Sequence, residues 1–365
     1  MATYIIMFIA SNILLNIYQW NGQEKSKDKY ILFSVFLIMI FIGGARYEVG
    51  RDFSMYEGQY NMLTQYTLNE IIGGHYPLKT EIGYALLNYF CYVMSWGFQG
   101  VVFICQAITV IFIYKAINYY CIDKYEKYIS TLVFMVVYYF STFNLIRQSL
   151  SMAIYIYISK YIFEKNFKKY IIGILIGSLF HQSILFMIPL YFIDKIKFNI
   201  KRFIVWLIII VSANKIIINL IIILLNLFNS KYMYYFENEI NKISSNGEGI
   251  GFFGIYNILV FLLAMYINSG ELKSNRKVRI VINMYGLYLL INTAFVGSEL
   301  LGRSTAYFTI FGIVVVPLIT RIRNSREKKL IFSSITIFYY LYYFYNLYFY
   351  VKHPLDMVIP YKFFI

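Results

Sequence analysis

The chain has 365 residues, of which 60% are hydrophobic and only 14% are charged, and it carries a formal net charge of +15. Soluble domains are about 45–50% apolar and about 25% charged, so this composition excludes a water-soluble enzyme, a disordered tail and a secreted disulfide scaffold. A polytopic membrane protein is the class that remains. The three cysteines lie in or beside apolar runs without metal-ligand spacing, so neither a disulfide framework nor a zinc site is expected.

Apolar runs bounded by charged residues predict membrane-spanning helices in chain order. Ten such runs occur, at 2–20, 30–45, 101–120, 128–143, 146–163, 203–228, 251–268, 279–296, 303–320 and 330–350. The run 169–193 is too long for one helix and holds His181 in its middle, so we expect two short helices that form a hairpin there. The run 81–96 is short, opens with Glu81 and contains Asn88, which predicts a re-entrant or interfacial helix.

The predicted fold is therefore an all-α, polytopic transmembrane helical bundle of about 12 spans. We expect a single integral membrane domain over residues 1–365, with two longer outer segments, 46–80 and 229–250, beside the candidate site.

The distribution of basic residues orients this layout. Two thirds of the 33 Lys and Arg residues lie in the loops 21–29, 121–127, 160–169, 194–202, 271–279 and 321–329. The positive-inside rule places these loops in the cytoplasm and both termini outside. The excess positive charge is thus a signal of topology, and no nucleic-acid partner is expected because the charge is not clustered on a water-exposed domain.

Four arginines on the outer side are not explained by topology, and ionisable residues at a membrane are candidate functional residues. They are Arg46, Arg51, Arg147 and Arg303. Arg46, Arg51 and Asp52 lie within seven residues of one another, after a pair of glycines. Guanidinium groups bind phosphate oxygens through two parallel hydrogen bonds, and Asp52 could orient an arginine or accept a proton. A solvated loop in which Arg51 and Asp52 pair is the alternative.

The other polar clusters also allow two interpretations. Arg147, followed by Gln148, could bind an anion, form an ion pair with Glu81 or Asp52, or extend to the interface. His181 could act as a general acid or base, donate to a phosphate, or be structural. Glu299 and Arg303 are four residues apart and share a helix face. They could form an internal salt bridge, or Arg303 could be a site arginine that Glu299 holds in place.

No P-loop, GxGxxG, HExxH, GxSxG or DxD motif is present in the sequence. This argues against an ATP-driven pump and against an enzyme that uses a nucleotide sugar. A basic site near the outer leaflet suits a lipid-linked anionic substrate whose energy already lies in its phosphate bond.

These polar motifs, taken in their order along the chain, resemble those of the EpsG family of Wzy-type polysaccharide polymerases. The family pattern R-Y-x-x-G-x-D-[YF]-x-x-Y is matched by Arg46-Tyr47-Glu48-Val49-Gly50-Arg51-Asp52-Phe53-Ser54-Met55-Tyr56. The later motifs are matched by Glu81-Ile82-Gly83-Tyr84, Arg147-Gln148, Phe180-His181 with Ser183, Arg303 with Tyr307-Phe308, and Pro360-Tyr361. The resemblance covers residues 1 to 362 and departs at Arg51, where the family more usually has a small residue such as Thr.

The resemblance implies a membrane glycosyltransferase of the bacterial cell (cytoplasmic) membrane, with its site facing the outer side. It would transfer a growing glycan from undecaprenyl pyrophosphate to the non-reducing end of a new lipid-linked repeat unit, building capsule, O-antigen or exopolysaccharide. The expected partners are undecaprenyl-pyrophosphate-linked oligosaccharides, the lipid bilayer, a repeat-unit flippase and a chain-length regulator. No cofactor or metal is expected, because arginines can supply the positive charge.

The resemblance and the residue chemistry together assign roles. Arg46, Arg51, Arg147 and Arg303 would bind the pyrophosphate. The base is His181 or Asp52, and His181 is preferred because the neighbouring Arg51 lowers the basicity of Asp52. Supporting residues would be Gln148, Glu81, Glu299, Tyr47, Tyr56 and Tyr307. Tyr47, Tyr56 and the outer aromatics Tyr232, Tyr234, Tyr235 and Phe236 could stack on sugar rings or form an ordinary interfacial belt.

Two other functions stay open at this point. A lipid-linked oligosaccharide flippase would also bind pyrophosphate, but would carry its charge in a central cavity that opens to both faces. A membrane acyltransferase would need an early His or Arg-His arrangement, and the only early candidate, His75, lies in a polar loop.

Overall fold

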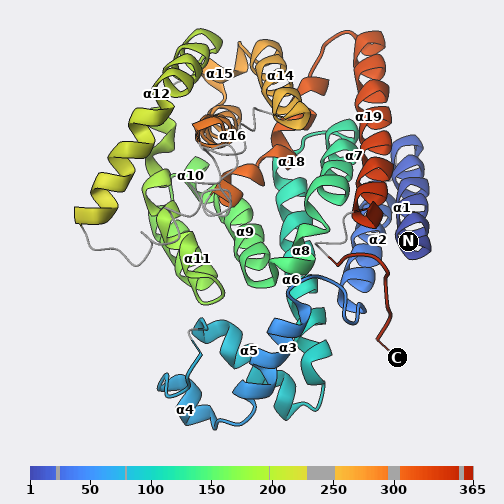
Figure 1. The fold of residues 1–365 in the computed structure, drawn as a ribbon. Helices are drawn as coiled ribbons and strands as arrows, with labels where there is room; N and C mark the ends of the chain where they lie inside the picture. The colour runs from blue at the N-terminus through green and yellow to red at the C-terminus, as the bar shows by residue number, and fades with distance from the viewer. Residues whose placement is uncertain are drawn as a thin grey trace. The chain divides into compact units, whose positions relative to one another are not determined.

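The computed structural model describes residues 1–21, 25–78, 80–196, 198–227, 251–294, 305–352 and 357–364. These residues are helical with connecting turns and form no strands, so the all-α class is confirmed for them. They divide into two compact units, the first made of Met1–Ile188 and Ser325–Ile365 and the second of Pro189–Asn324 (Figure 1). The expectation of one integral membrane domain stays a prediction.

Four helices form the centre of the first unit: α1 (Ala2–Trp20), α2 (Lys25–Gly44), α6 (Gly97–Tyr120) and α9 (Ile146–Ile158). Helix α6 packs against both α2 and α9, and α1 packs against α2. Helix α1 buries Tyr4, Phe8 and Leu15 and leaves Ile9 and Ile13 exposed. An exposed isoleucine face on a helix of this length is typical of contact with lipid chains.

Three short helices lie together beyond one end of this centre: α3 (Phe53–Leu63), α4 (Leu68–Ile72) and α5 (Ile82–Val93). The predicted outer segment 46–80 therefore contains two short helices, α3 and α4, joined by turns. Thr67 and Glu70 form a capping box that starts α4. Glu81 is the N-cap of α5, which confirms a short helix in the run 81–96.

Breaks in the backbone shape the next part of the first unit. The run 128–143 is divided into α7 (Lys124–Val133), the π-helix η1 (Phe134–Tyr138) and α8 (Ser141–Asn144). The chain leaves helical geometry at Leu145 and starts again in α9, so Arg147 lies in the first turn of that helix.

The predicted hairpin in the run 169–193 is present as two short helices. After α10 (Lys160–Phe163) the chain forms α11 (Phe167–Ser178), then a turn, then the 3₁₀ helix η2 (Gln182–Lys195). Helix η2 belongs to the first unit as far as Ile188 and to the second unit from Pro189 on. His181 lies in the turn between them. The unit is completed by α19 (Ser325–Lys352), which packs against α7.

The second unit is formed by α12 (Ile200–Leu227), α14 (Phe252–Ile267), α15 (Glu271–Ser274), α16 (Arg276–Ala294), α18 (Gly312–Val315) and the 3₁₀ helix η3 (Val316–Thr320). Helix α16 packs against α12 and α14, and α14 packs against η3. A Cβ atom at Gly286 of α16 would lie 2.9 Å from the ring of Phe261, so the glycine permits this close approach.

Among the described residues, α1 and α6 are long and apolar enough to cross a bilayer by length and composition. Three further apolar helices are shorter, at Ile82–Val93, Phe253–Ile267 and Thr305–Thr320. Helix α19 has sufficient length, but it is rich in tyrosine, whose hydroxyl lowers the hydropathy of the segment. The number of spans, about 12, stays a prediction.

Candidate functional site

The candidate site lies within the first unit, where three predicted residues from distant parts of the chain meet. Arg147 donates through Nη1 to Oε2 of Glu81. The other carboxylate oxygen, Oε1, lies 3.2 Å from Nδ1 of His181 and accepts from the backbone amide of Gln182, also at 3.2 Å. The contact with His181 is at ion-pair distance but without the alignment of a hydrogen bond. Of the three explanations for Arg147, the structure therefore shows the ion pair with Glu81.

Backbone contacts hold the turn that carries His181 against the start of α5. The amides of Gly83 and Tyr84 donate to the carbonyl of Leu179, at 2.8 and 3.2 Å. A Cβ atom at position 83 would lie 2.7 Å from that carbonyl oxygen. Glycine at position 83 is therefore required for the two segments to approach, and this approach places His181 beside Glu81.

Two tyrosines lie beside the guanidinium of Arg147. Its Cζ atom is 5.7 Å from the ring centroid of Tyr56 and 5.6 Å from that of Tyr84. Tyr56 comes from α3 and Tyr84 from α5, and their ring centroids are 5.9 Å apart. Rings near a guanidinium stabilise its charge, so Arg147 stays charged in a partly buried place where 18% of its side chain is exposed.

The electrostatics of Glu81 follow from these contacts. Burial would raise its pKa, but the contact with His181 and the charge of Arg147 outweigh burial, and the pKa of Glu81 is lowered from its ordinary value. The carboxylate is thus ionised at neutral pH and holds one cation on each side when His181 is protonated.

Arg46 is placed differently from the other arginines, because only 1% of it is exposed. Its guanidinium donates through Nη1 to the carbonyl of Gly43 and through Nη2 to the carbonyl of Phe143, at 3.4 Å for the latter. It also lies 4.4 Å from the ring centroid of Phe143. Burial lowers the pKa of Arg46 to about 10, which leaves it charged at neutral pH. A phosphate can reach this group only after these contacts open.

The turn between Arg46 and α3 is fixed by glycine and by an asparagine that sequence reasoning missed. Gly50 has a φ of +106°, a conformation that favours glycine. Asn144 accepts from the amide of Arg51 at 2.7 Å, so this turn is tied to the residues just before α9. The Arg51 side chain is 45% exposed and its Nε lies 3.4 Å from Oδ1 of Asp52, the N-cap of α3. The pair between Arg51 and Asp52, which was the alternative interpretation of this loop, is therefore present, and the Arg51 side chain is still accessible.

The C-terminal tail packs against the same turn. The amide of Tyr47 donates to the carbonyl of Lys362, and the amide of Phe364 donates to the carbonyl of Ala45, both at 2.9 Å. The hydroxyl of Tyr361 donates to the carbonyl of Ile42 at 2.8 Å. The tail that contains the Pro-Tyr motif thus lies against the backbone on both sides of Arg46, a contact that its position in the sequence did not indicate.

The remaining predicted residues fall into three groups. Gln148 is buried beside Arg147, and the ring centroid of Tyr47 lies 5.8 Å from that of Phe53 and 6.0 Å from that of Phe364. Tyr307 is fully buried in the second unit. Arg303, Glu299 and the aromatics Tyr232, Tyr234, Tyr235 and Phe236 lie outside the described residues.

No three His, Cys, Asp or Glu side chains of the described residues gather as a metal site would need. What the assembled groups can do is hold an anion and move a proton. An arginine and a histidine share one carboxylate, and a second, accessible arginine lies on the turn that Asn144 holds.

Comparison with known proteins agrees with this chemistry. The sequence profile of the EpsG family matches residues 29–363. The helical fold and the cluster of arginines, glutamate and histidine thus belong to a membrane protein of polysaccharide biosynthesis. The chain belongs to the EpsG family, a Wzy-type polymerase-like family, which confirms the resemblance found in the sequence. No curated protein and no solved structure matches the chain.

Proposed function

We propose that the protein polymerises oligosaccharide repeat units carried on undecaprenyl pyrophosphate, at the outer leaflet of the bacterial cell membrane. The acceptor hydroxyl of the incoming unit attacks the anomeric carbon of the growing glycan, the bond from that carbon to the pyrophosphate oxygen breaks, and undecaprenyl pyrophosphate leaves. The observation that carries the proposal is the meeting of Arg147, Glu81 and His181 in a chain of the EpsG family.

His181 is the proposed general base. A general base needs a partner that orients its ring and stabilises the charge it gains, and Glu81 lies 3.2 Å from Nδ1. The second ring nitrogen, Nε2, has no partner among the described residues, and 28% of the side chain is exposed. This arrangement favours His181 over Asp52, whose carboxylate pairs with Arg51.

Arg147 is the proposed ligand of the leaving pyrophosphate. Its guanidinium is held by Glu81 before the substrate arrives, so little reorganisation is needed when charge develops on the leaving group. Arg51 is the exposed arginine of the same region, and we assign it to the pyrophosphate as well. Arg303 keeps its proposed role as a further ligand.

Arg46 is proposed to position this site rather than to bind the substrate in the closed conformation. Its guanidinium donates to the carbonyl groups of Gly43 and Phe143, and Phe143 lies four residues before Arg147. The turn that follows Arg46 bears Arg51, so the Arg46 contacts help to set where Arg51 and Arg147 lie.

A deletion strain tests the proposal when the envelope glycan is resolved by size and the lipid-linked intermediates are analysed in parallel. Loss of long polymer, with single repeat units on lipid at the outer face, is the expected result. Repeat units trapped at the inner face would indicate a flippase, and full-length polymer that lacks an acyl group would indicate an acyltransferase.

Complementation with variants then connects the activity to the residues. We expect His181→Gln and Arg147→Ala each to reduce polymerisation by roughly 10²- to 10³-fold, the usual effect of removing a general base or a preorganised charge. Lys165→Ala, in a predicted cytoplasmic loop and exposed, is the matched control and should restore normal polymer. Full-length polymer from either site variant would contradict its assigned role.

A further inference from the structure

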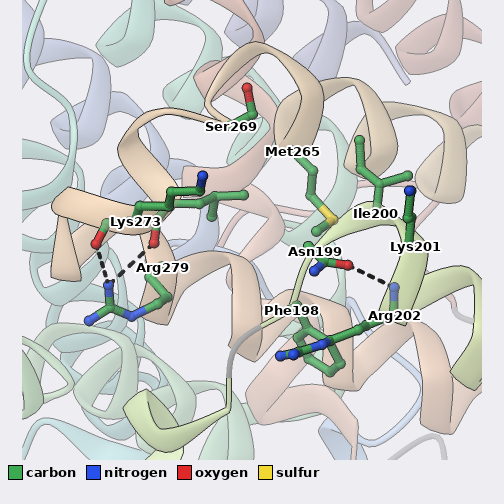
Figure 2. Close-up of a pocket in the computed structure, with 10 residues that line it drawn as sticks. Phe198, Asn199, Ile200, Lys201, Arg202, Met265, Ser269, Lys273 and Arg279 are labelled. Carbon is green, nitrogen blue, oxygen red and sulfur yellow. Dashed lines mark hydrogen bonds between the residues drawn. The ribbon is translucent and has the colours of Figure 1, made fainter.

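The second unit contains a cavity of about 740 Å³ that the proposed polymerisation does not use. It lies between the start of α12 and the residues from the end of α14 to the start of α16 (Figure 2). Its ten lining residues include four cations and no carboxylate. Figure 2 shows Lys273 and Arg279 on one side and Lys201 and Arg202 on the other.

The charge of this cavity is only partly balanced. Arg279 pairs with Asp194 at 2.7 Å and donates to the carbonyls of Leu272 and Lys273. The same Asp194 also accepts from Arg276, so one carboxylate serves two arginines. The ammonium groups of Lys201 and Lys273 have no ion pair or hydrogen bond within the described ranges, and both side chains are exposed. A ligand here would meet two lysines that nothing in the described protein neutralises.

Of the other six lining residues, Asn199 and Ser269 are polar, and four are apolar: Phe198, Ile200, Met265 and Leu272. A cavity lined by both apolar and basic side chains matches a molecule that joins a phosphate to a hydrocarbon chain. A free phosphate would gain nothing from the apolar lining, because burial of apolar surface is favourable only when the ligand itself is apolar there.

Two exposed aromatic residues lie on the helices that line this cavity and suit a position at the level of lipid headgroups. Trp206 of α12 and Tyr266 of α14 are 51% and 70% exposed. Tryptophan and tyrosine concentrate where hydrocarbon meets headgroups. The positive-inside bias puts residues 194–202 and 271–279 on the cytoplasmic side, where anionic phospholipids attract basic residues.

We propose that this cavity binds an anionic phospholipid of the cytoplasmic leaflet. Its phosphate would lie between Lys201 and Lys273, and the first part of its acyl chains would contact Met265 and Leu272. The lipid would contribute the negative charge that the described protein does not supply to these two lysines.

The test is native mass spectrometry of the purified full-length protein titrated with phosphatidylglycerol, with phosphatidylcholine as the neutral comparison. We expect clear retention of phosphatidylglycerol by the wild-type protein. The double variant Lys201→Gln/Lys273→Gln should bind it about twenty-five-fold more weakly, because each basic residue near an anionic lipid contributes roughly five-fold in affinity. The variant Lys201→Arg/Lys273→Arg should keep the affinity, which shows that charge is what matters.

The matched control is Lys168→Gln/Lys329→Gln, which removes the same charge from two exposed lysines of other predicted cytoplasmic loops. This control should bind phosphatidylglycerol as the wild type does. Three outcomes would overturn the proposal: equal affinity in the Gln double variant and the wild type, equal retention of phosphatidylcholine, or displacement of the lipid by inorganic phosphate. The readout needs no polymerisation, so it is independent of the proposed function.

Discussion

Replacing Gly83 with alanine displaces the turn that carries His181 without removing any charge. The new Cβ atom would lie 2.7 Å from the carbonyl oxygen of Leu179, about 0.7 Å short of the 3.4 Å at which ordinary contact begins. Because the obstacle is backbone, the two segments must separate. The hydrogen bonds from the amides of Gly83 and Tyr84 to Leu179 then lengthen.

The size of the effect follows from these contacts. Overpacking costs typically about 1–3 kcal/mol and each of the two weakened hydrogen bonds about 1 kcal/mol, so we expect a local destabilisation of roughly 3–5 kcal/mol. A displacement approaching 1 Å at a catalytic group reduces rates by up to about 10²-fold. We therefore expect a ten- to hundred-fold loss of polymerisation.

The assay compares polymer length and rate in complemented deletion strains, normalised to the amount of folded protein in the membrane. Gly58→Ala is the control, because Gly58 lies in α3 and a Cβ atom added there would meet nothing within 4 Å apart from its chain neighbours and the backbone of its own helix. This substitution should leave polymerisation unchanged. Polymer of wild-type length and rate from the Gly83→Ala protein would refute the reasoning that the contact with Leu179 sets the place of His181.

Other predictions follow from the arginines and from Glu81. Arg147→Lys should retain only part of the activity, since an ammonium group cannot reproduce the two-pronged geometry of a guanidinium, and single-turnover measurements should show roughly ten-fold slower transfer. Arg46→Gln should lower the free energy of unfolding by roughly 2–4 kcal/mol, because the carbonyls of Gly43 and Phe143 lose a charged donor. The loss is measurable as a lower thermal unfolding temperature in detergent. Loss of activity with unchanged stability would instead make Arg46 a substrate ligand. Because the pKa of Glu81 is lower in the folded protein, its ionised carboxylate stabilises the fold. This stabilisation is fully present above the unfolded pKa of about 4.3 and is lost as the pH falls through the lower folded pKa. Thermal unfolding scans should therefore show this loss of stability only in acid, and Glu81→Gln should abolish the pH dependence.

Much of the site was predictable because its chemistry is unusual for a membrane. Arginines that do not serve topology are rare, and this alone singled out Arg147 and Arg51. The histidine within an apolar run was found in the same way, and its place between two short helices is confirmed. The helical class followed from composition, since only helices and closed barrels can span a bilayer.

The remaining features depend on contacts between residues far apart in the chain. That Glu81 would hold both Arg147 and His181 depends on a meeting of three segments which no local pattern encodes. The surroundings of Arg46 depend on Phe143 and on the C-terminal tail, where Phe363 forms a backbone bridge with Arg46. Asn144 was missed because an asparagine at the end of a helix has many ordinary uses, and only the hydrogen bond to Arg51 distinguishes it.

The most direct test of the central claim is polymerisation by the purified full-length protein in lipid vesicles, supplied only with a lipid-linked repeat unit. A polymerase with His181 as its base should produce a ladder of longer lipid-linked glycans, with one undecaprenyl pyrophosphate released for each unit added, and the His181→Gln protein should produce no such ladder. A wild-type protein that leaves the repeat unit at its original length, or that moves it across the bilayer unchanged, would contradict the account.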